Sequence, residues 1–552
     1  MKRTRLLAAA LIAVVTGLGA RAAASSAHAS IEPSEFTGSQ GPTARGISVD
    51  PRHLPGSITP QGQAEGQPAP FPEDPSIFAQ QKVQANAAAA SQAKLQAIVP
   101  GSAARAASFT SSFTGMDMNA ACAPSLCYHT PDGAVAVGPT SVLEMVNQAF
   151  AVYGRTGNLM LGPIKLYSFF QADNPPYDVR TLYDASNAGG SGYGGGDGRF
   201  VIMALSKGTR ASSYWIAVSQ NSRPQSASMK WCTYRLDGTT SNIGQLAGAD
   251  YPGMGMDGDH IYITSNQITF GNPPFFQGAR ILAIPKSSIY PNVNTGVCPT
   301  ATSTDFRFPL NPDGKHAYTL QPASKPDALQ RTGSTQMFFV NALRSGNSQI
   351  ALRSIVSGPS GLTLGSPKLI NVAPYSIPAN VPQPGGGAIF SGGDNTLLGS
   401  MYRYGKIYTA NSTRTWRGGG GNAYSNVQWY EITPGSSNAV THVIGNPNVA
   451  YFMPQVVAGC TVNSSPCPSS YVALEFTGSG PNQPASAFGV LGTRSPAITR
   501  SGVAGYSFTG AWGDFPGVSV DPNDRSHVWL EGEYAGSPTD WGTVITPTCP
   551  SC

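Results

Sequence analysis

The sequence predicts an all-β fold, a seven-bladed β-propeller with six or eight blades as alternatives, preceded by a low-complexity N-terminal segment. An eight-residue motif occurs twice, as DYPGMGMD at 250–257 and as DFPGVSVD at 514–521, which indicates a repeated structural unit. After Phe109, short runs of alternating β-branched and aromatic residues recur between clusters of Gly, Pro, Asn and Asp. This texture is typical of strands joined by turns.

The first 29 residues resemble an export signal. Basic residues precede an apolar run from Leu6 to Leu18, and Ala27-His28-Ala29 has the small-x-small pattern of a cleavage site. We therefore expect a mature chain that begins at Ser30 and is secreted, in the extracellular space or the periplasm. No other apolar stretch is long enough to cross a bilayer, so no membrane insertion is expected.

The charge balance argues against nucleic acid as a partner. The whole chain has a formal net charge of +5, but loss of the leader leaves 30 basic against 29 acidic residues. Charged residues make up only 11% of the chain, and no run of Lys or Arg lies outside the leader. We therefore expect neither nucleic acid nor anionic lipid as a partner.

Residues 30–108 form a Pro/Ala/Gln-rich segment with few large apolar side chains. Such a composition cannot bury enough apolar surface to offset the entropy lost on ordering. We expect a flexible linker or a propeptide, with helical character from Ser76 to Ile98 that a partner would stabilise. The propeller is assigned to residues 109–552.

Seven groups of strands follow, and they begin near Asp132, Asp178, Asp250, Thr319, Gly387, Tyr451 and Trp512. About 60 residues per group suffice for four strands with long loops, and a propeller is the natural closure of a repeated antiparallel unit. Inner strands crowd around the axis of a propeller. We therefore expect Gly253 and Gly255 to face the channel, and Met254 and Met256 to pack between blades.

The eight cysteines form an even set in a chain expected to be exported, which favours disulfides. Proximity in sequence favours pairing Cys122 with Cys127, Cys460 with Cys467 and Cys549 with Cys552, which leaves Cys232 with Cys298. Eight cysteines permit 105 connectivities, so this pairing is a preference. The Cys549-Pro-Ser-Cys552 tail resembles a redox CxxC motif, but no strand-helix context surrounds it, and a structural disulfide is favoured.

Several stretches are similar to the blade signatures of poorly characterised secreted bacterial proteins, taken to be β-propellers of the broad sialidase-like kind. Between about residues 115 and 545 these are DGAVAVGP at 132–139, EMVN at 144–147, DVRTLYD at 178–184, DYPG at 250–253, LQPA at 320–323, and WGDFPG at 512–517 with EY at 533–534. The resemblance implies the fold and no reaction. The Ser-x-Asp-x-Gly-x-x-Trp turns and the Phe/Tyr-Arg-Ile-Pro start of true sialidases are absent, which argues against sialic acid cleavage.

Aspartates are the candidate catalytic residues: Asp250 and Asp514, with Asp132 and Asp178 as alternates. Each blade of a propeller contributes to one funnel, so we expect these residues to meet at the channel mouth. Glycan hydrolysis requires two facing carboxyl groups, one of them kept protonated by its surroundings. The candidates for substrate binding are the sugar-stacking rings of Tyr251, Phe515 and Trp512 and the guanidinium of Arg180. The alternative for each aspartate is that it caps its own turn, through hydrogen bonds from its side chain to the backbone of that turn.

These residues predict a secreted enzyme that acts on an extracellular glycan, as a glycoside hydrolase or a polysaccharide lyase. The alternative is a non-catalytic carbohydrate-binding or adhesion propeller whose partner is an extracellular glycan or another cell-surface ligand. No histidine spacing typical of zinc occurs. Calcium is the one cofactor considered, at the turns Asp521-Pro-Asn-Asp524 or Asp257-Gly-Asp259. Glu475 and Glu533, each beside an aromatic residue, are further candidates for an acid with a raised pKa.

Overall fold

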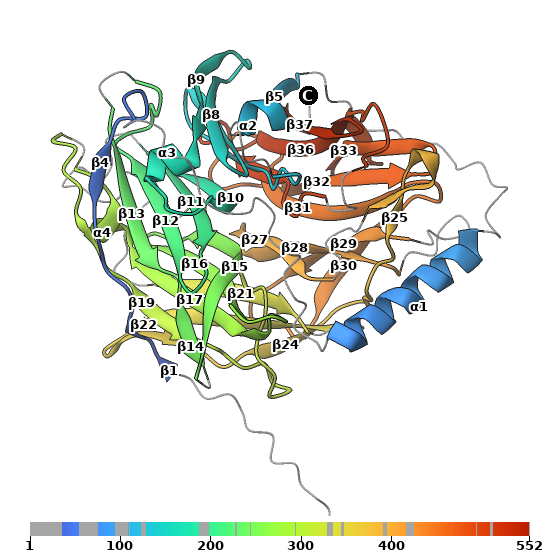
Figure 1. Ribbon diagram of the computed structural model, residues 1–552, viewed down its shortest axis with the longest axis horizontal. Helices are drawn as coiled ribbons and strands as arrows, with labels where there is room; N and C mark the ends of the chain where they lie inside the picture. The colour runs from blue at the N-terminus through green and yellow to red at the C-terminus, as the bar shows by residue number, and fades with distance from the viewer. Residues whose placement is uncertain are drawn as a thin grey trace, which may run out of the picture.

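The chain is seen in a computed structural model that describes residues 36–54, 75–93, 109, 111–122, 128–186, 198–226, 229–242, 244–292, 294–327, 335–343, 347–389, 395–415, 424–492, 494–507, 512–550 and 552. Seven antiparallel sheets surround a central axis (Figure 1). The predicted seven-bladed β-propeller is therefore confirmed. The expected signal segment, residues 1–29, lies outside the described residues.

The blades follow one another along the chain, and each starts with its innermost strand. Blade 1 has β6 (Ala134–Val137), β7 (Ser141–Val146), β8 (Ala149–Gly154) and β9 (Leu159–Lys165); blade 2 has β10 (Tyr177–Asp184), β11 (Arg199–Lys207), β12 (Ser212–Ser219) and β13 (Trp231–Asp237). Blade 3 has β15 (Gln245–Met256), β16 (His260–Thr269), β17 (Phe276–Pro285) and β19 (Thr304–Arg307), and β14 (Thr240–Asn242) pairs with β15. Blade 4 has β20 (Gln321–Pro322), β21 (Gln336–Ala342), β22 (Gln349–Gly358) and β23 (Gly361–Leu364), and β24 (Lys368–Asn371) also pairs with β22.

The remaining blades have the same antiparallel order. Blade 5 has β27 (Leu397–Arg403), β28 (Lys406–Thr413), β29 (Asn426–Ile432) and β30 (Ala439–Ile444), and blade 6 has β31 (Ala450–Cys460), β32 (Ser470–Gly480), β33 (Gln483–Leu491) and β34 (Ala497–Arg500). Blade 7 has β35 (Gly517–Val520), β36 (Val528–Ser537), β37 (Asp540–Thr548) and β5 (Phe113–Asp117). The predicted start of blade 5 at Gly387 is wrong, because Gly387 lies in a hairpin between β25 (Val381–Pro382) and β26 (Ala388–Ile389).

Blade 7 closes the ring with strands from both ends of the propeller. Its outermost strand, β5, precedes blade 1 in the chain and pairs with β37, with Phe113 opposite Ile545 and Asp117 opposite Gly542. Closure by hydrogen bonds between distant segments removes free sheet edges that would otherwise remain at the two ends of the ring. The stability of blade 7 therefore controls whether the ring stays closed.

Residues 36–49, here called the N-terminal strap, lie along the outer edge of three blades (Figure 1). Strand β1 (Phe36–Thr37) pairs with β23, β2 (Ser39–Gln40) with β19, β3 (Ala44–Arg45) with β18 (Thr300–Ala301), and β4 (Ile47–Val49) with β13. The flexible linker expected over 30–108 is therefore wrong for these residues. Composition missed the strap because backbone hydrogen bonds to an exposed sheet edge require few large apolar side chains.

Helix α1 (Pro75–Ala93) also lies against the propeller, near the connection between blades 4 and 5. Ala85 and Ala89 pack on Ala379, and Nζ of the buried Lys82 donates a hydrogen bond to the carbonyl of Pro378 (2.8 Å). The helical character expected here is confirmed over these residues. The other helices are the short α2 (Met118–Ala121), α3 (Leu166–Phe170), α4 (Lys286–Ile289) and the 3-10 turn η1 (Pro384–Gly386).

Apolar clusters fill the spaces between successive blades and hold them at fixed angles. Between blades 1 and 2, Phe169 of α3 meets Phe150 and Trp231 edge to face, with ring centroids 5.1 and 5.8 Å apart. All three rings are fully buried. Large buried aromatic side chains contribute heavily to stability, so the ring is a rigid frame for the residues at its axis.

Three disulfides are present among the described residues: Cys232–Cys298, Cys460–Cys467 and Cys549–Cys552. They confirm three of the predicted pairs. Cys127 lies outside the described residues, so its pairing with Cys122 stays a prediction. Disulfides are typical of exported proteins. In the described part of the chain, the helices are all too short or too polar to span a membrane.

Candidate functional site

Near the start of the inner strand, most blades bend the chain through a residue in the left-handed conformation. These residues are Asp132, Asp178, Tyr251, Thr319, Gly399 and Met453, with φ between 44° and 61°. This conformation is unfavourable for side chains other than Gly, Asn and Asp. The surrounding structure must therefore stabilise it.

Hydrogen bonds between neighbouring blades, here called the interblade bonds, supply that stabilisation. The N–H of Asp178 donates to Asn147 Oδ1 of blade 1 (2.9 Å), and the N–H of Tyr251 donates to Asp178 Oδ2 (2.9 Å). In blade 4, the N–H of Thr319 donates to Asn266 Oδ1 of blade 3 (2.7 Å). Asp178 thus accepts the N–H of a left-handed residue in the next blade, as the amides of Asn147 and Asn266 do.

Asp132 makes an interblade bond in the opposite direction around the ring. Its Oδ1 accepts the N–H of Asp514 in blade 7 (2.7 Å), and its Oδ2 accepts Nδ2 of Asn147 (2.7 Å). Asp132 and Asp178 thus accept backbone N–H groups of neighbouring blades, whereas the expected cap was of the turn to which each aspartate belongs. Asn147, which links both aspartates, was not among the predicted site residues. Its side chain was not singled out because nothing in the sequence near Asn147 reveals its contact with Asp178 of blade 2.

Asp178 and Asp250 form a carboxyl pair between blades 2 and 3. Asp178 Oδ2 accepts the N–H of Tyr251, the residue after Asp250, and the two carboxyl groups are close enough to interact electrostatically. Repulsion between two neighbouring carboxylates favours a proton on one of them. Burial, together with the negative charges of Asp250 and Asp132, raises the pKa of Asp178 well above its usual range. Burial also raises the pKa of Asp250, against the opposing charge of Lys207. Asp178 is buried and Asp250 is partly exposed, so one end of the pair reaches the surface.

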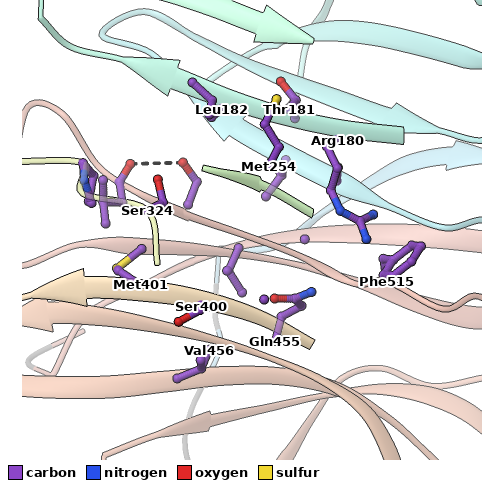
Figure 2. Close-up of a pocket in the computed structure, with 18 of the residues that line it drawn as sticks. Arg180, Thr181, Leu182, Met254, Ser324, Ser400, Met401, Gln455, Val456 and Phe515 are labelled. Carbon is purple, nitrogen blue, oxygen red and sulfur yellow. Dashed lines mark hydrogen bonds between the residues drawn. The ribbon is translucent and has the colours of Figure 1, made fainter. Parts of the chain in front are cut away.

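Arg180 lies beside the aspartates and is stacked on an aromatic ring. Its guanidinium carbon is 3.3 Å from the ring centroid of Phe515, and Figure 2 shows the two side chains meeting. Tyr251 packs on the same ring, with centroids 4.6 Å apart. Burial lowers the pKa of Arg180 to about 10, while the charges of Asp178, Asp132 and Asp514 oppose that change. Arg180, which was predicted to bind a carboxylate of the substrate, therefore already interacts with the carboxylates of its own chain.

A cavity follows the axis of the propeller, and its wall includes the inner strands of all seven blades (Figure 2). Arg180, Phe515 and Gln455 lie on this wall, whereas the four candidate aspartates are not among the described residues that line it. The glycines of β15 were expected to face the channel and the methionines to pack between blades, but the structure shows the opposite arrangement. Met254 and Met256 line the cavity, whereas Gly253 and Gly255 face Pro322 of blade 4, which approaches too closely to leave room for side chains.

The expected sugar-stacking rings are mostly inaccessible. Phe515 and Trp512 are buried in the apolar core, at 0% and 2% exposure. Trp512 Nε1–H donates to Thr477 Oγ1 of blade 6 (3.1 Å). That these two rings hold sugar stays a prediction, and both rings pack in the apolar core at the junction of blades 6, 7 and 1. Tyr251 is partly exposed.

Blade 7 and its neighbours contain four further acids that are at most 1% exposed: Glu144, Glu475, Glu531 and Glu533. Both oxygens of Glu531 and one oxygen each of Glu475 and Glu533 have no hydrogen-bond partner. Burial raises the pKa of Glu475, Glu531 and Glu533 well above the usual range. Burial likewise raises the pKa of Glu144 to about 7. The raised pKa expected for Glu475 and Glu533 is therefore present, but both side chains are sealed from solvent.

The turns considered for calcium have their carboxylates engaged in the fold. Asp257 accepts hydrogen bonds from the backbone of Asp259 and His260 (2.9 and 2.8 Å) and from the Tyr262 hydroxyl (2.9 Å). Asp521 bonds to Arg155 and to Trp529 Nε1 (3.0 Å). Calcium binding at these turns stays a prediction.

Tyr128 is a further residue near the aspartates that sequence reasoning did not select. Its side chain is 8% exposed, and its ring stacks on Tyr177 with centroids 6.5 Å apart. Burial and the charges of Asp178 and Asp132 raise the pKa of its hydroxyl. No local motif marks Tyr128, because it reaches the site from the segment before blade 1.

No protein-family model and no curated protein sequence matches the chain. Among solved structures, extracellular domains 1–2 of Drosophila Semaphorin 1b match with a TM-score of 0.31 at 8% identity, over 80% of this chain and 87% of that one. The α-L-arabinofuranosidase Arb93A from Fusarium graminearum, in complex with an iminosugar inhibitor, matches with a TM-score of 0.24 at 10% identity, over 55% of this chain and 98% of that one.

Proposed function

We propose that the protein is a secreted glycan-active enzyme, a hydrolase or a lyase, in which the Asp178–Asp250 pair supplies the acid. The observation that carries this proposal is the close approach of two carboxyl groups between blades 2 and 3, one buried and one partly exposed. A proton held at a solvent-facing carboxyl is what general acid catalysis at near-neutral pH requires.

In this proposal Asp250 donates its proton to the oxygen that leaves the sugar. The bond between that oxygen and the sugar carbon breaks, and its electron pair goes to the oxygen. Hydrolysis then needs a second carboxylate to activate water or to bind the sugar carbon, whereas a lyase needs a base to remove a proton from the ring. Both reactions use the same acid, so the pair supports either one.

The second carboxylate is assigned to Asp514. Glycosidases hold their two carboxyl groups about 5 to 5.5 Å apart for retention or about 6.5 to 9.5 Å apart for inversion. Asp178 and Asp250 are assigned together to the acid, because the negative charge of Asp250 helps to raise the pKa of Asp178. Asp514 is partly exposed and interacts electrostatically with Arg180, whereas Asp132 is buried and engaged by Asn147 and by backbone.

The test is turnover of a panel of polysaccharides by the mature protein, followed as new reducing ends for hydrolysis and as ultraviolet absorbance of unsaturated sugars for elimination. Loss of a general acid is expected to lower the rate by about 10²- to 10⁴-fold, so Asp250→Asn should show this loss and Asp514→Asn a comparable one. Asp313→Asn, an exposed aspartate in the loop after β19, is the matched control. Unchanged turnover in the first two variants would remove these roles.

A non-catalytic carbohydrate-binding or adhesion propeller is the second candidate. The observation that favours it is the set of interblade bonds, because Asn147, Asn266 and Asp178 make equivalent bonds and the fold alone then accounts for Asp178. A glycan array, with thermal unfolding measured in calcium and in chelator, separates the two functions. Binding of a glycan without release of product supports this candidate. A higher unfolding temperature in calcium than in chelator would show that calcium stabilises the fold.

A further inference from the structure

The C-terminal disulfide lies against a histidine that an aspartate holds in place. Sγ of Cys552 is 3.5 Å from His527 Nε2, and His527 Nε2 and both sulfurs lie within 4.8 Å of one another. The other ring nitrogen, His527 Nδ1, is 3.1 Å from Asp524 Oδ2. The Asp524 carboxylate, the His527 imidazole and the disulfide thus lie next to one another in space, with the imidazole in the middle.

Asp524 is itself fixed by the turn before β36. Its Oδ1 accepts the N–H of Ser526 (2.8 Å) and the Ser526 hydroxyl (2.6 Å), and the N–H of His527 donates to its carbonyl (3.0 Å). A carboxylate at Nδ1 orients an imidazole ring and leaves Nε2 as the nitrogen available to other groups. Nε2 is therefore the nitrogen that faces the sulfurs.

The two sulfurs differ in access. Cys552 is exposed, whereas Cys549 is 3% exposed, and Cys552 is the one exposed residue among the cysteines that the structure describes. The pair lies just beyond the end of β37, so opening it leaves the strands of blade 7 paired. Because the bond closes a loop of only three residues, the fold loses little constraint when it opens.

From this geometry we propose that Cys549 and Cys552 form a redox-active pair that exchanges with thiols and dithiols outside the cell. A thiolate attacks Sγ of Cys552 and forms a mixed disulfide. The Cys549–Cys552 bond breaks, its electron pair goes to Cys549, and that sulfur takes a proton from the solvent. A second thiolate then attacks the outer sulfur of the mixed disulfide and releases Cys552, whose sulfur takes a proton from His527 Nε2, 3.5 Å away. Two thiols are oxidised to one disulfide and the protein pair is reduced by two electrons.

The test compares reduction rates of the three described disulfides in the full mature protein. Dithiothreitol or glutathione is added, the reaction is stopped by alkylation, and the peptides are quantified by mass spectrometry. We expect Cys549–Cys552 to open at least tenfold faster than Cys460–Cys467, which closes a surface loop without a histidine partner. Equal rates for these two disulfides would overturn the proposal.

Variants of the histidine and aspartate test their roles. His527→Gln should slow the reduction of Cys549–Cys552 at least fivefold and flatten its pH dependence, and Asp524→Asn should shift the same pH profile, as expected for a positioning residue. His53→Gln is the control, because the His53 side chain is 79% exposed and lies in the segment that follows the strap. Thermal unfolding of each variant checks the fold. Wild-type rates and pH profile in His527→Gln would contradict the mechanism.

Discussion

Glu531 of blade 7 packs directly against the backbone of Gly133 of blade 1, so that a Cβ atom on Gly133 would lie 2.3 Å from both carboxylate oxygens. Gly513 has the same relationship to Glu533, and Gly532 to Glu475. The glycines next to blade 7 thus provide space for buried carboxyl groups. A buried carboxylate without a partner is unfavourable, so these acids are expected to carry protons.

Gly133→Ala should destabilise the closure of the ring. The new methyl group would collide with Glu531, and overpacking of a tight interior costs about 1 to 3 kcal/mol. Urea unfolding followed by tryptophan fluorescence measures the loss. Gly387→Ala is the matched control, since Gly387 has φ −71° and no atom within 4 Å of its added Cβ. Equal stability of the two variants would contradict the packing.

The buried glutamates should make the protein less stable as the pH rises. Burial raises the pKa of Glu144 from 4.5 to about 7. Below pH 4.5 this group is protonated in both the folded and the unfolded chain. Between pH 4.5 and 7 the unfolded chain releases the proton first, so the free energy of unfolding falls by about 1.4 kcal/mol per pH unit for each such group. Glu475, Glu531 and Glu533 extend this loss above pH 7.

Glutamine variants isolate these contributions. Glu144→Gln should flatten the dependence of stability on pH between 4.5 and 7, and Glu531→Gln should raise stability at pH 8 while leaving it nearly unchanged at pH 5. Urea midpoints at pH 5, 6, 7 and 8 measure both effects. Asp313→Asn, at an exposed position, should leave the pH dependence as in the wild type. A wild-type slope in both glutamine variants would show that the glutamates are not the titrating groups.

Asn147→Ala should remove two hydrogen bonds at once, one interblade bond and one bond to Asp132 within blade 1. Asn147 donates to Asp132 and accepts from the N–H of Asp178, so its truncation leaves buried polar groups unpaired, at about 1 to 3 kcal/mol. Thermal and urea unfolding measure this loss. Asn294→Ala, at an exposed position in the loop after α4, should change stability little. A comparable small effect at Asn147 would mean that water or neighbouring residues replace its bonds.

Sequence reasoning was most successful where the information is local. The repeated octets and the alternating strands predicted the ring and most blade starts, because each blade contains its own pattern. The carboxyl pair was predicted only in part: Asp178 and Asp250 were selected, but their close approach depends on the angle between two blades. The same angle brings Asn147 to Asp178, and Phe515 looked exposed because its burial is produced by other blades.

The strap was missed for a different reason, and its role can be tested directly. It pairs with the blades mainly through backbone hydrogen bonds, with few large side chains such as Phe36 packed on the core, so its composition resembles that of a linker. Gly46 lies where the strap passes the Cys232–Cys298 disulfide, and an added Cβ would stand 2.6 Å from Cys298 Cβ and 2.7 Å from the Pro299 carbonyl. Gly46→Ala should therefore detach β3 and β4 locally without unfolding the ring.

Hydrogen exchange measures this detachment. In Gly46→Ala, amides of residues 44–49 and of their partners in β13 should exchange at least tenfold faster than in the wild type, while amides of the inner strands keep their protection. The reason is that β13 becomes a free sheet edge once β4 leaves it. Gly387→Ala serves again as the control. Wild-type protection of the strap in Gly46→Ala would mean that the close approach at Gly46 does not hold the strap in place.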